Sequence, residues 1–140
     1  MKKLIIKAFT TQSDHTQDIS LSYEHFGLPL DQAPVVLVNH ALTGNSNVAG
    51  ADGWWSALIG PDKCIDTNRY AVLAFNIPGN GYDGFVIDAY KQFVAKDMAQ
   101  LFLMGLEALG VSKLYAIIGG SLGGGIAWEM AAINPAITSH

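Results

Sequence analysis

Ser121 is the residue whose surroundings point most directly to chemistry. It stands at the centre of Gly119-Gly120-Ser121-Leu122-Gly123, which matches the pattern G-x-S-x-G. In that pattern a serine occupies a sharp turn between a strand and a helix, and its hydroxyl is held out as a nucleophile. Glycine is needed two positions to either side, because a Cβ there is expected to collide with the neighbouring strand or helix. The first hypothesis is therefore acyl transfer through a serine.

The context of the motif strengthens this hypothesis, because the five letters alone can arise by chance in a chain with 15 glycines. A short apolar run, 114–118, precedes the motif, and a helical pattern starts at Leu122. Three consecutive glycines, 123–125, open that helix although each costs about 1 kcal/mol relative to Ala, which suggests a packing or functional need. The alternatives are an ordinary glycine-rich turn or a phosphate-binding loop, but the G-x-G-x-x-G spacing of dinucleotide-binding loops is not met.

Acyl transfer to a serine also needs hydrogen-bond donors for the oxyanion that forms. One donor is expected to be the backbone N–H of Leu122, directly after the serine, and the other an N–H of the loop 39–44. That loop contains His40. A structural, hydrogen-bonded histidine is favoured there over a catalytic base, because the base in this arrangement comes after the serine in the chain.

The predicted elements form an α/β arrangement. Three continuous apolar runs, each too short for a helix, predict buried central strands. They cover 35–38, 70–75 and 114–118. Apolar residues at helical spacing predict helices over 93–109, ending at Gly110, and over 122–133, ending before Asn134-Pro135.

Two further strands, 3–9 and 19–26, predict an opening hairpin. Strand, helix and strand in succession predict a parallel crossover, so the central runs should share one mostly parallel sheet with covering helices. The expected fold class is α/β, and 140 residues amount to about one domain.

Four segments in their order and spacing resemble the homoserine O-acetyltransferase family of the α/β-hydrolase superfamily. They are His40-Ala41-Leu42-Thr43-Gly44, Gly53-Trp54-Trp55 with Leu58-Ile59-Gly60-Pro61, Ile65-Asp66-Thr67-Asn68-Arg69-Tyr70, and Gly119-Gly120-Ser121-Leu122-Gly123-Gly124. The resemblance covers most of the chain from about residue 35 to 135. It implies an α/β-hydrolase fold, of which residues 1–140 would be the N-terminal part, truncated after the helix that follows Ser121.

The resemblance implies a ping-pong reaction of methionine biosynthesis. The serine takes an acetyl group from acetyl-CoA, and the hydroxyl of homoserine then takes it from the serine. Carried over to this chain, Ser121 is the nucleophile, Leu42 and Leu122 give the oxyanion-hole N–H groups, and Thr43 and Gly44 line the substrate pocket. Acetyl-CoA enters as a substrate, and no cofactor or metal is implied.

Two segments near these residues complete the comparison with the family. Trp54 and Trp55 are expected to be core or pocket wall and not to take part in the chemistry. Many family members carry a Gly-Ser-Thr segment and a long proline-rich loop, whereas this chain has the different and shorter segment 76–85 before its helix.

The acid and the histidine of a catalytic triad should follow the serine in this fold. After Ser121 the chain offers only Glu129, expected to be a solvated helix residue, and His140, its last residue. We therefore expect a fragment that is inactive alone. Its run 114–118 would be an open apolar edge, which we expect to pair with another copy, giving a homo-oligomer, or with the missing half of the domain.

Composition excludes several other classes of protein. The chain is 50% hydrophobic and 14% charged, with a net charge of −4 and its basic residues scattered, which argues for an ordered globular protein without a nucleic-acid partner. It lacks the run of about 18 apolar residues that a membrane span needs. Its single cysteine, Cys64, favours the cytoplasm, and the four histidines show no metal-ligand spacing.

Two other functions remain open beside the acyltransferase. One is a serine esterase or another hydrolase of the same fold, which would differ in how well its acyl-enzyme is shielded from water. The other is a non-catalytic binding or assembly module that kept the fold and lost the chemistry.

Overall fold

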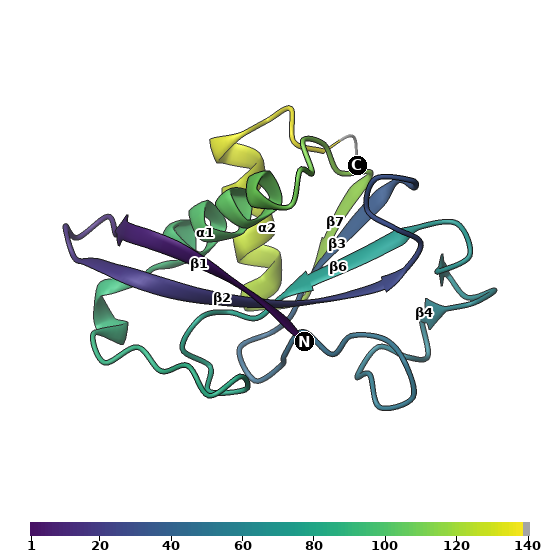
Figure 1. Cartoon of the computed structure of the whole chain (residues 1–140), viewed down its shortest axis with the longest axis horizontal. Helices are drawn as coiled ribbons and strands as arrows, with labels where there is room; N and C mark the ends of the chain where they lie inside the picture. The colour runs from purple at the N-terminus through teal and green to yellow at the C-terminus, as the bar shows by residue number, and fades with distance from the viewer. Residues whose placement is uncertain (139–140) are drawn as a thin grey trace.

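A five-stranded sheet organises the chain in the computed structural model, which describes residues 1–138 (Figure 1). Its strands, in spatial order, are β1 (Lys2–Thr10), β2 (Thr16–Gly27), β6 (Ala71–Phe75), β3 (Val35–Asn39) and β7 (Ala116–Gly119). The pairs β1–β2 and β2–β6 are antiparallel, whereas β6–β3 and β3–β7 are parallel. The predicted opening hairpin, the parallel centre and the α/β class are confirmed.

The two central strands are buried on both faces, which explains why their sequences are continuous apolar runs. Successive side chains of a strand point to opposite faces, so each strand contributes to two apolar clusters. The larger cluster takes Val35, Leu37, Ala71, Leu73 and Phe75, and the smaller cluster takes Val36, Val38, Val72 and Ala74.

Two helices, α1 (Ala95–Ala108) and α2 (Leu122–Ile133), contact each other and supply apolar side chains to the larger cluster (Figure 1). A single 3-10 turn, η1 (Tyr90–Gln92), precedes α1. Gly110 ends α1 as predicted. It has φ 72°, and its N–H donates to the Glu107 carbonyl at 2.9 Å while the Val111 N–H donates to the Leu106 carbonyl at 2.9 Å. None of the helices within residues 1–138 is long and apolar enough to cross a membrane.

Asp97 departs from the pattern of an amphipathic helix, in which charged residues face solvent. The structure buries it completely. Its carboxylate accepts hydrogen bonds from the backbone N–H of Val94, at the start of α1, and of Gln12, in the hairpin turn, both at 2.8 Å. Burial is tolerated because both carboxylate oxygens are bonded.

The smaller apolar cluster is covered by the segment between β3 and β6. This segment contains β4 (Ile59–Gly60) and β5 (Ile65–Asp66), a two-residue parallel pair. It contributes Val48, Ala49 and Ile59 to the cluster. Sequence patterns did not predict β4 or β5, since strands of two residues carry no periodicity.

The strand before Ser121 starts two residues later than predicted. Leu114 N–H donates to the Ile137 carbonyl at 2.7 Å, and Leu114 forms an isolated parallel bridge with Thr138. Leu114 therefore pairs with the segment that follows α2, whereas the Tyr115 N–H already donates to the Val35 carbonyl of β3 at 2.8 Å, and the register of β7 with β3 begins at Ala116. Among the described residues, β3 is the only strand that pairs with β7 itself.

Candidate functional site

Ser121 occupies the turn between β7 and α2 in a conformation that L-residues rarely adopt. Its backbone has φ 53° and ψ −121°, and the residue is exposed. Such a conformation costs about 1–3 kcal/mol and persists only where the surrounding structure holds it. The turn therefore presents the Ser121 side chain at the surface of the molecule.

The glycines on either side of Ser121 are required by close packing. A Cβ on Gly119 would lie 2.3 Å from the Gly123 carbonyl oxygen, and a Cβ on Gly123 would lie 2.2 Å from the Asn39 carbonyl oxygen. Both distances are far below any real Cβ contact, so the collisions expected from the spacing are present. The third glycine of the run 123–125 differs, because a Cβ on Gly125 would meet nothing within 4 Å.

The loop after β3 lies against this turn. Asn39 is the register partner of Gly119, and Gly123 packs on the backbone of Asn39 and His40. A tight turn over residues 41–44 follows, closed by a hydrogen bond of 2.9 Å from the Gly44 N–H to the Ala41 carbonyl. Leu42 and Thr43 form the corner of this turn and are exposed, and Gly44 is half-buried.

The five residues predicted from sequence thus lie on two adjoining segments. Ser121 comes from the turn before α2 and Leu122 is the first residue of α2, whereas Leu42, Thr43 and Gly44 come from the turn after β3. Within residues 1–138 the backbone N–H groups of Leu42 and Leu122 donate to no acceptor. Both are therefore available to a ligand oxygen.

His40 is fully buried, and its ring holds two loops together. The Nδ1 atom lies 2.6 Å from the Ala41 carbonyl oxygen, and Nε2 lies 3.0 Å from the Ile77 nitrogen, which donates to it. Burial lowers the pKa of His40, and the hydrogen bond to the Ala41 carbonyl opposes this effect in part. The predicted structural, hydrogen-bonded histidine is confirmed.

A second buried residue, Asn76, directly follows β6 and fixes the same loops. Its Oδ1 accepts a hydrogen bond of 2.7 Å from the Ser46 N–H, and its Nδ2 donates to the Ser22 hydroxyl at 2.8 Å. Farther along this loop, Asn80 Nδ2 donates to the Gly44 carbonyl at 3.4 Å. Sequence reasoning gave Asn76 no role, although a polar residue directly after a buried strand was a usable signal.

The two tryptophans lie beside the turn after β3. Trp54 Nε1 donates to the Asn45 carbonyl at 2.9 Å, and the centroids of the Trp54 and Trp55 rings are 4.6 Å apart. Trp55 packs against the smaller apolar cluster, as expected for a residue of the core or wall. Trp54 keeps 39% of its surface exposed.

Among residues 1–138, none of the histidines is free to activate Ser121. In the part of the chain that the structure describes, His15 bonds Gln17, His25 bonds the Leu28 carbonyl, and both ring nitrogens of His40 are used. Glu129 is half-buried on α2. His140 lies outside the described residues, and residues 1–138 contain no cluster of His, Cys, Asp or Glu that could hold a metal ion.

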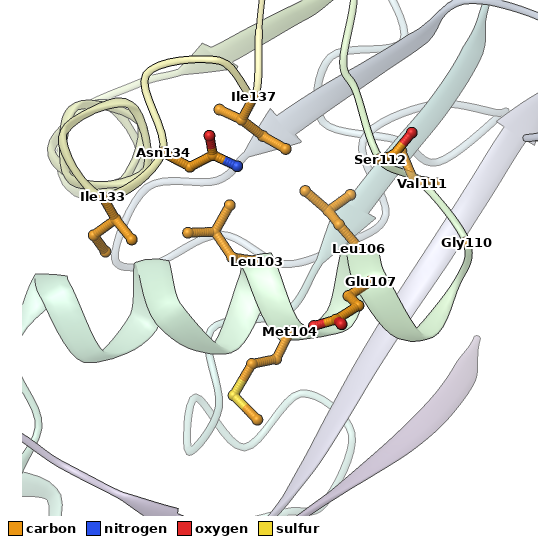
Figure 2. Close-up of a pocket in the computed structure, with 10 residues that line it drawn as sticks. All are labelled: Leu103, Met104, Leu106, Glu107, Gly110, Val111, Ser112, Ile133, Asn134 and Ile137. Carbon is orange, nitrogen blue, oxygen red and sulfur yellow. The ribbon is translucent and has the colours of Figure 1, made fainter.

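A cavity of about 440 Å³ lies elsewhere, between the C-terminal parts of α1 and α2 (Figure 2). In Figure 2 the side chains of Leu103 and Leu106 rise from α1 toward Asn134 and Ile137. None of the predicted site residues lines it. Its lining is mostly apolar, with Glu107, Ser112 and Asn134 as its polar residues, and it contains no histidine or cysteine, so we interpret it as incomplete packing between helix ends.

The sequence matches a known family over most of its length. The family model described as the alpha/beta hydrolase fold matches residues 34–138. A homoserine O-acetyltransferase of Methanococcus vannielii is 37% identical over 155 aligned positions, which take in 96% of this chain and 30% of that protein. The aligned positions exceed the 140 residues of this chain, so that protein carries additional residues inside the aligned region.

Two solved structures share the fold closely. The homoserine O-acetyltransferase from Bacillus anthracis has a TM-score of 0.86 and 27% identity, with 98% of this chain and 44% of that chain covered. Esterase E22 also has a TM-score of 0.86 and 27% identity, with 99% and 45% covered. The chain thus spans between 30% and 45% of the length of these three proteins. It belongs to the α/β-hydrolase fold family, and its sequence is similar to the homoserine O-acetyltransferases of that family.

Proposed function

We propose that this chain is the nucleophile-bearing, N-terminal part of a single α/β-hydrolase domain that transfers an acetyl group from acetyl-CoA to homoserine. The observation that carries the proposal is the strained, exposed backbone of Ser121 between two glycines that packing requires. Similarity to homoserine O-acetyltransferases supports the choice of substrates.

The proposed reaction has two steps that share one geometry. The Ser121 hydroxyl oxygen attacks the thioester carbonyl of acetyl-CoA, the carbon–sulfur bond breaks, and the thiol leaves with the proton that the serine gave up. The hydroxyl of homoserine then attacks the acyl-Ser121 carbonyl, O-acetylhomoserine leaves, and Ser121 regains its proton. The free N–H groups of Leu42 and Leu122 would stabilise the oxyanion in both steps, with Thr43 and Gly44 lining the pocket.

The proposal requires a base that the described residues do not place beside Ser121. We infer that the histidine and the acid come from the remainder of a hydrolase domain, as in the serine, acid and histidine order of this fold. The chain alone should then be inactive. We also propose a cytoplasmic location, since Cys64 has no second cysteine within this chain to pair with.

We further propose that the open side of β7 pairs with a second copy of the chain. A hollow there is lined mainly by small and apolar residues of β7 and α2, among them Ile117, Ala127 and Trp128. Trp128 is 81% exposed, which is unusual for so large an apolar side chain. An apolar strand edge beside such a patch favours association.

Turnover by a polypeptide that carries this chain together with the remainder of a hydrolase domain tests the function. Acetyl-CoA and homoserine are supplied, and the products are identified by mass spectrometry. O-Acetylhomoserine is expected, and it should disappear in the Ser121→Ala variant but persist in Ser112→Ala, which alters an exposed serine outside the site.

Two other outcomes of this assay would point to a different function. Acetate without O-acetylhomoserine would identify a hydrolase, an alternative that the equal structural similarity to esterase E22 favours. No product and no labelling of Ser121 by a fluorophosphonate would identify a binding or assembly module.

A further inference from the structure

His40 lies where three segments of the proposed site meet. Its backbone packs against the first turn of α2, because a Cβ on Gly123 would lie 2.6 Å from the His40 carbonyl oxygen. Its side chain packs against the turn after β3, because a Cβ on Gly44 would lie 2.9 Å from His40 Cβ. Its ring reaches the loop after β6 at Ile77.

The hydrogen bonds of the ring determine which nitrogen carries the proton. The Ile77 N–H can only donate, so Nε2 must be an acceptor without a proton. Nδ1 then carries the proton and donates to the Ala41 carbonyl. That same carbonyl accepts the Gly44 N–H that closes the turn, so the turn and the ring are joined at one oxygen atom.

This arrangement leaves His40 no proton-transfer role. Both ring nitrogens are engaged by backbone groups, and the side chain is completely buried. A base for Ser121 would instead need a free nitrogen within reach of the hydroxyl.

We propose that His40 is a positioning residue for the oxyanion-binding turn. Its neutral ring, protonated on Nδ1, fixes the distance between the turn 41–44 and the loop that begins at Ile77, and so aims the Leu42 N–H at the acyl oxygen. The aim of that N–H rests on the proposed function, whereas the linkage of the two loops is independent of turnover. A misplacement of about 1 Å is enough to weaken catalysis by up to about 100-fold.

The first test measures the ring nitrogens of His40 by NMR in the 140-residue chain labelled with ¹⁵N-histidine. We expect a single form with the proton on Nδ1 and with Nε2 unprotonated at neutral pH. A proton on Nε2, or two forms in exchange, would overturn the proposal. This measurement needs no variant, so it decides the question even if substitutions at His40 prevent folding.

The second test compares two variants that each keep one half of the linkage. The amide of Gln reaches about as far as Nε2 and that of Asn about as far as Nδ1, so His40→Gln retains an acceptor for the Ile77 N–H and His40→Asn retains only the bond to Ala41. We expect hydrogen exchange of the Ile77 amide to accelerate about tenfold or more in His40→Asn and much less in His40→Gln.

The control is His25→Gln, which alters a histidine that bonds a loop carbonyl outside the proposed site. It should leave both the Ile77 exchange rate and the Leu42 amide chemical shift unchanged. If His40→Asn also leaves both unchanged, His40 does not link the loops.

Kinetics of the polypeptide that carries the remainder of the domain test the aim of the Leu42 N–H. His40→Asn should lower kcat by up to about 100-fold with a smaller change in KM. His40→Gln, which keeps the acceptor for the Ile77 N–H, should lower kcat much less. An unchanged kcat despite faster Ile77 exchange would overturn the role in catalysis. Absence of acetyl transfer by the unmodified protein, with the ring form as expected, would count against the proposed function alone.

Discussion

At the scale of single residues, the glycines near Ser121 differ in what they do. Gly119 and Gly123 allow the chain to pass within van der Waals contact of other backbone atoms, so any side chain would push segments of the site apart. Gly125 has no such neighbour. Its lack of a side chain therefore only weakens the helix.

This difference predicts opposite effects of the same substitution. Gly123→Ala should destabilise the protein by about 3 kcal/mol or more, because its Cβ would overlap the Asn39 carbonyl. Gly125→Ala should stabilise it by about 0.5–1 kcal/mol, because alanine favours the helix. Urea unfolding at one protein concentration compares the two. Equal midpoints would contradict the packing described for Gly123.

The burial of His40 should make the free energy of unfolding depend on pH. Burial lowers its pKa in the folded chain below the ordinary value of 6.5, so the unfolded chain binds a proton first as the pH falls. The contribution of the neutral His40 ring to the free energy of unfolding is therefore complete well above pH 6.5. It is lost progressively below pH 6.5, at up to about 1.4 kcal/mol per pH unit.

Urea unfolding at pH 7.5 and pH 5.5 checks this sign. The unmodified chain should lose more stability on acidification than His40→Gln, since glutamine does not titrate. Identical losses in the two proteins would show that His40 takes up its proton equally in the folded and unfolded states.

Sequence reasoning performed differently for the two kinds of site residue. Ser121 and its glycines form a local motif, so the strand, the turn and the packing need of the glycines could all be predicted. His40 and Asn76 act through contacts with residues 30 or more positions away. No local pattern reports such contacts, and His40 was assigned correctly only because a base was expected later in the chain.

At the scale of elements, continuous apolar runs identified β3 and β6 because both faces of these strands are buried. The end of α1 was also predictable, since Gly110 adopts the left-handed conformation that glycine favours. The start of β7 was not, because Leu114 pairs with Thr138 and not with β3. Apolar character alone does not reveal which neighbour a residue pairs with.

The start of α1 depends on Asp97, whose burial the helical pattern did not predict. Asp97→Ala would remove both acceptors and leave the N–H groups of Val94 and Gln12 without partners. We expect a loss of about 2–3 kcal/mol in unfolding free energy. The adjacent Lys96→Ala, at an exposed position of the same helix, should change it by less than about 0.5 kcal/mol. Similar unfolding midpoints for both variants would contradict this role.

At the scale of the whole molecule, the open side of β7 should govern association. Light scattering during size-exclusion chromatography is expected to show dimers or larger species of the 140-residue chain. Trp128→Glu should shift these species toward the monomer, because it places a charge on the exposed apolar patch. A monomer at all concentrations with cooperative unfolding would contradict the proposal, and binding only to a separately supplied remainder of the domain would identify that remainder as the partner.

Reactivity of Ser121 should likewise depend on what lies outside residues 1–138. Without a base beside its hydroxyl, turnover by the chain alone should fall by about 10⁴-fold or more relative to the polypeptide with the remainder of the domain. The rate at which a fluorophosphonate labels Ser121, followed by mass spectrometry, reports the reactivity of its hydroxyl in each protein. Rapid labelling of Ser121 in the chain alone would mean that another group within it activates the serine.

The short bridge between Leu114 and Thr138 has a directional consequence. Because it is parallel, a segment extended from Thr138 along β7 would travel the same way as β3 and β7. Parallel strands finish at a common rim of their sheet, and here that rim holds Ser121 and the turn 41–44. Any side chain at the far end of such a segment would emerge as a neighbour of the serine. Where the remainder of the domain is present, such a segment would take the side of β7 that a second copy takes in the chain alone, and its far end would bring a proton acceptor beside Ser121.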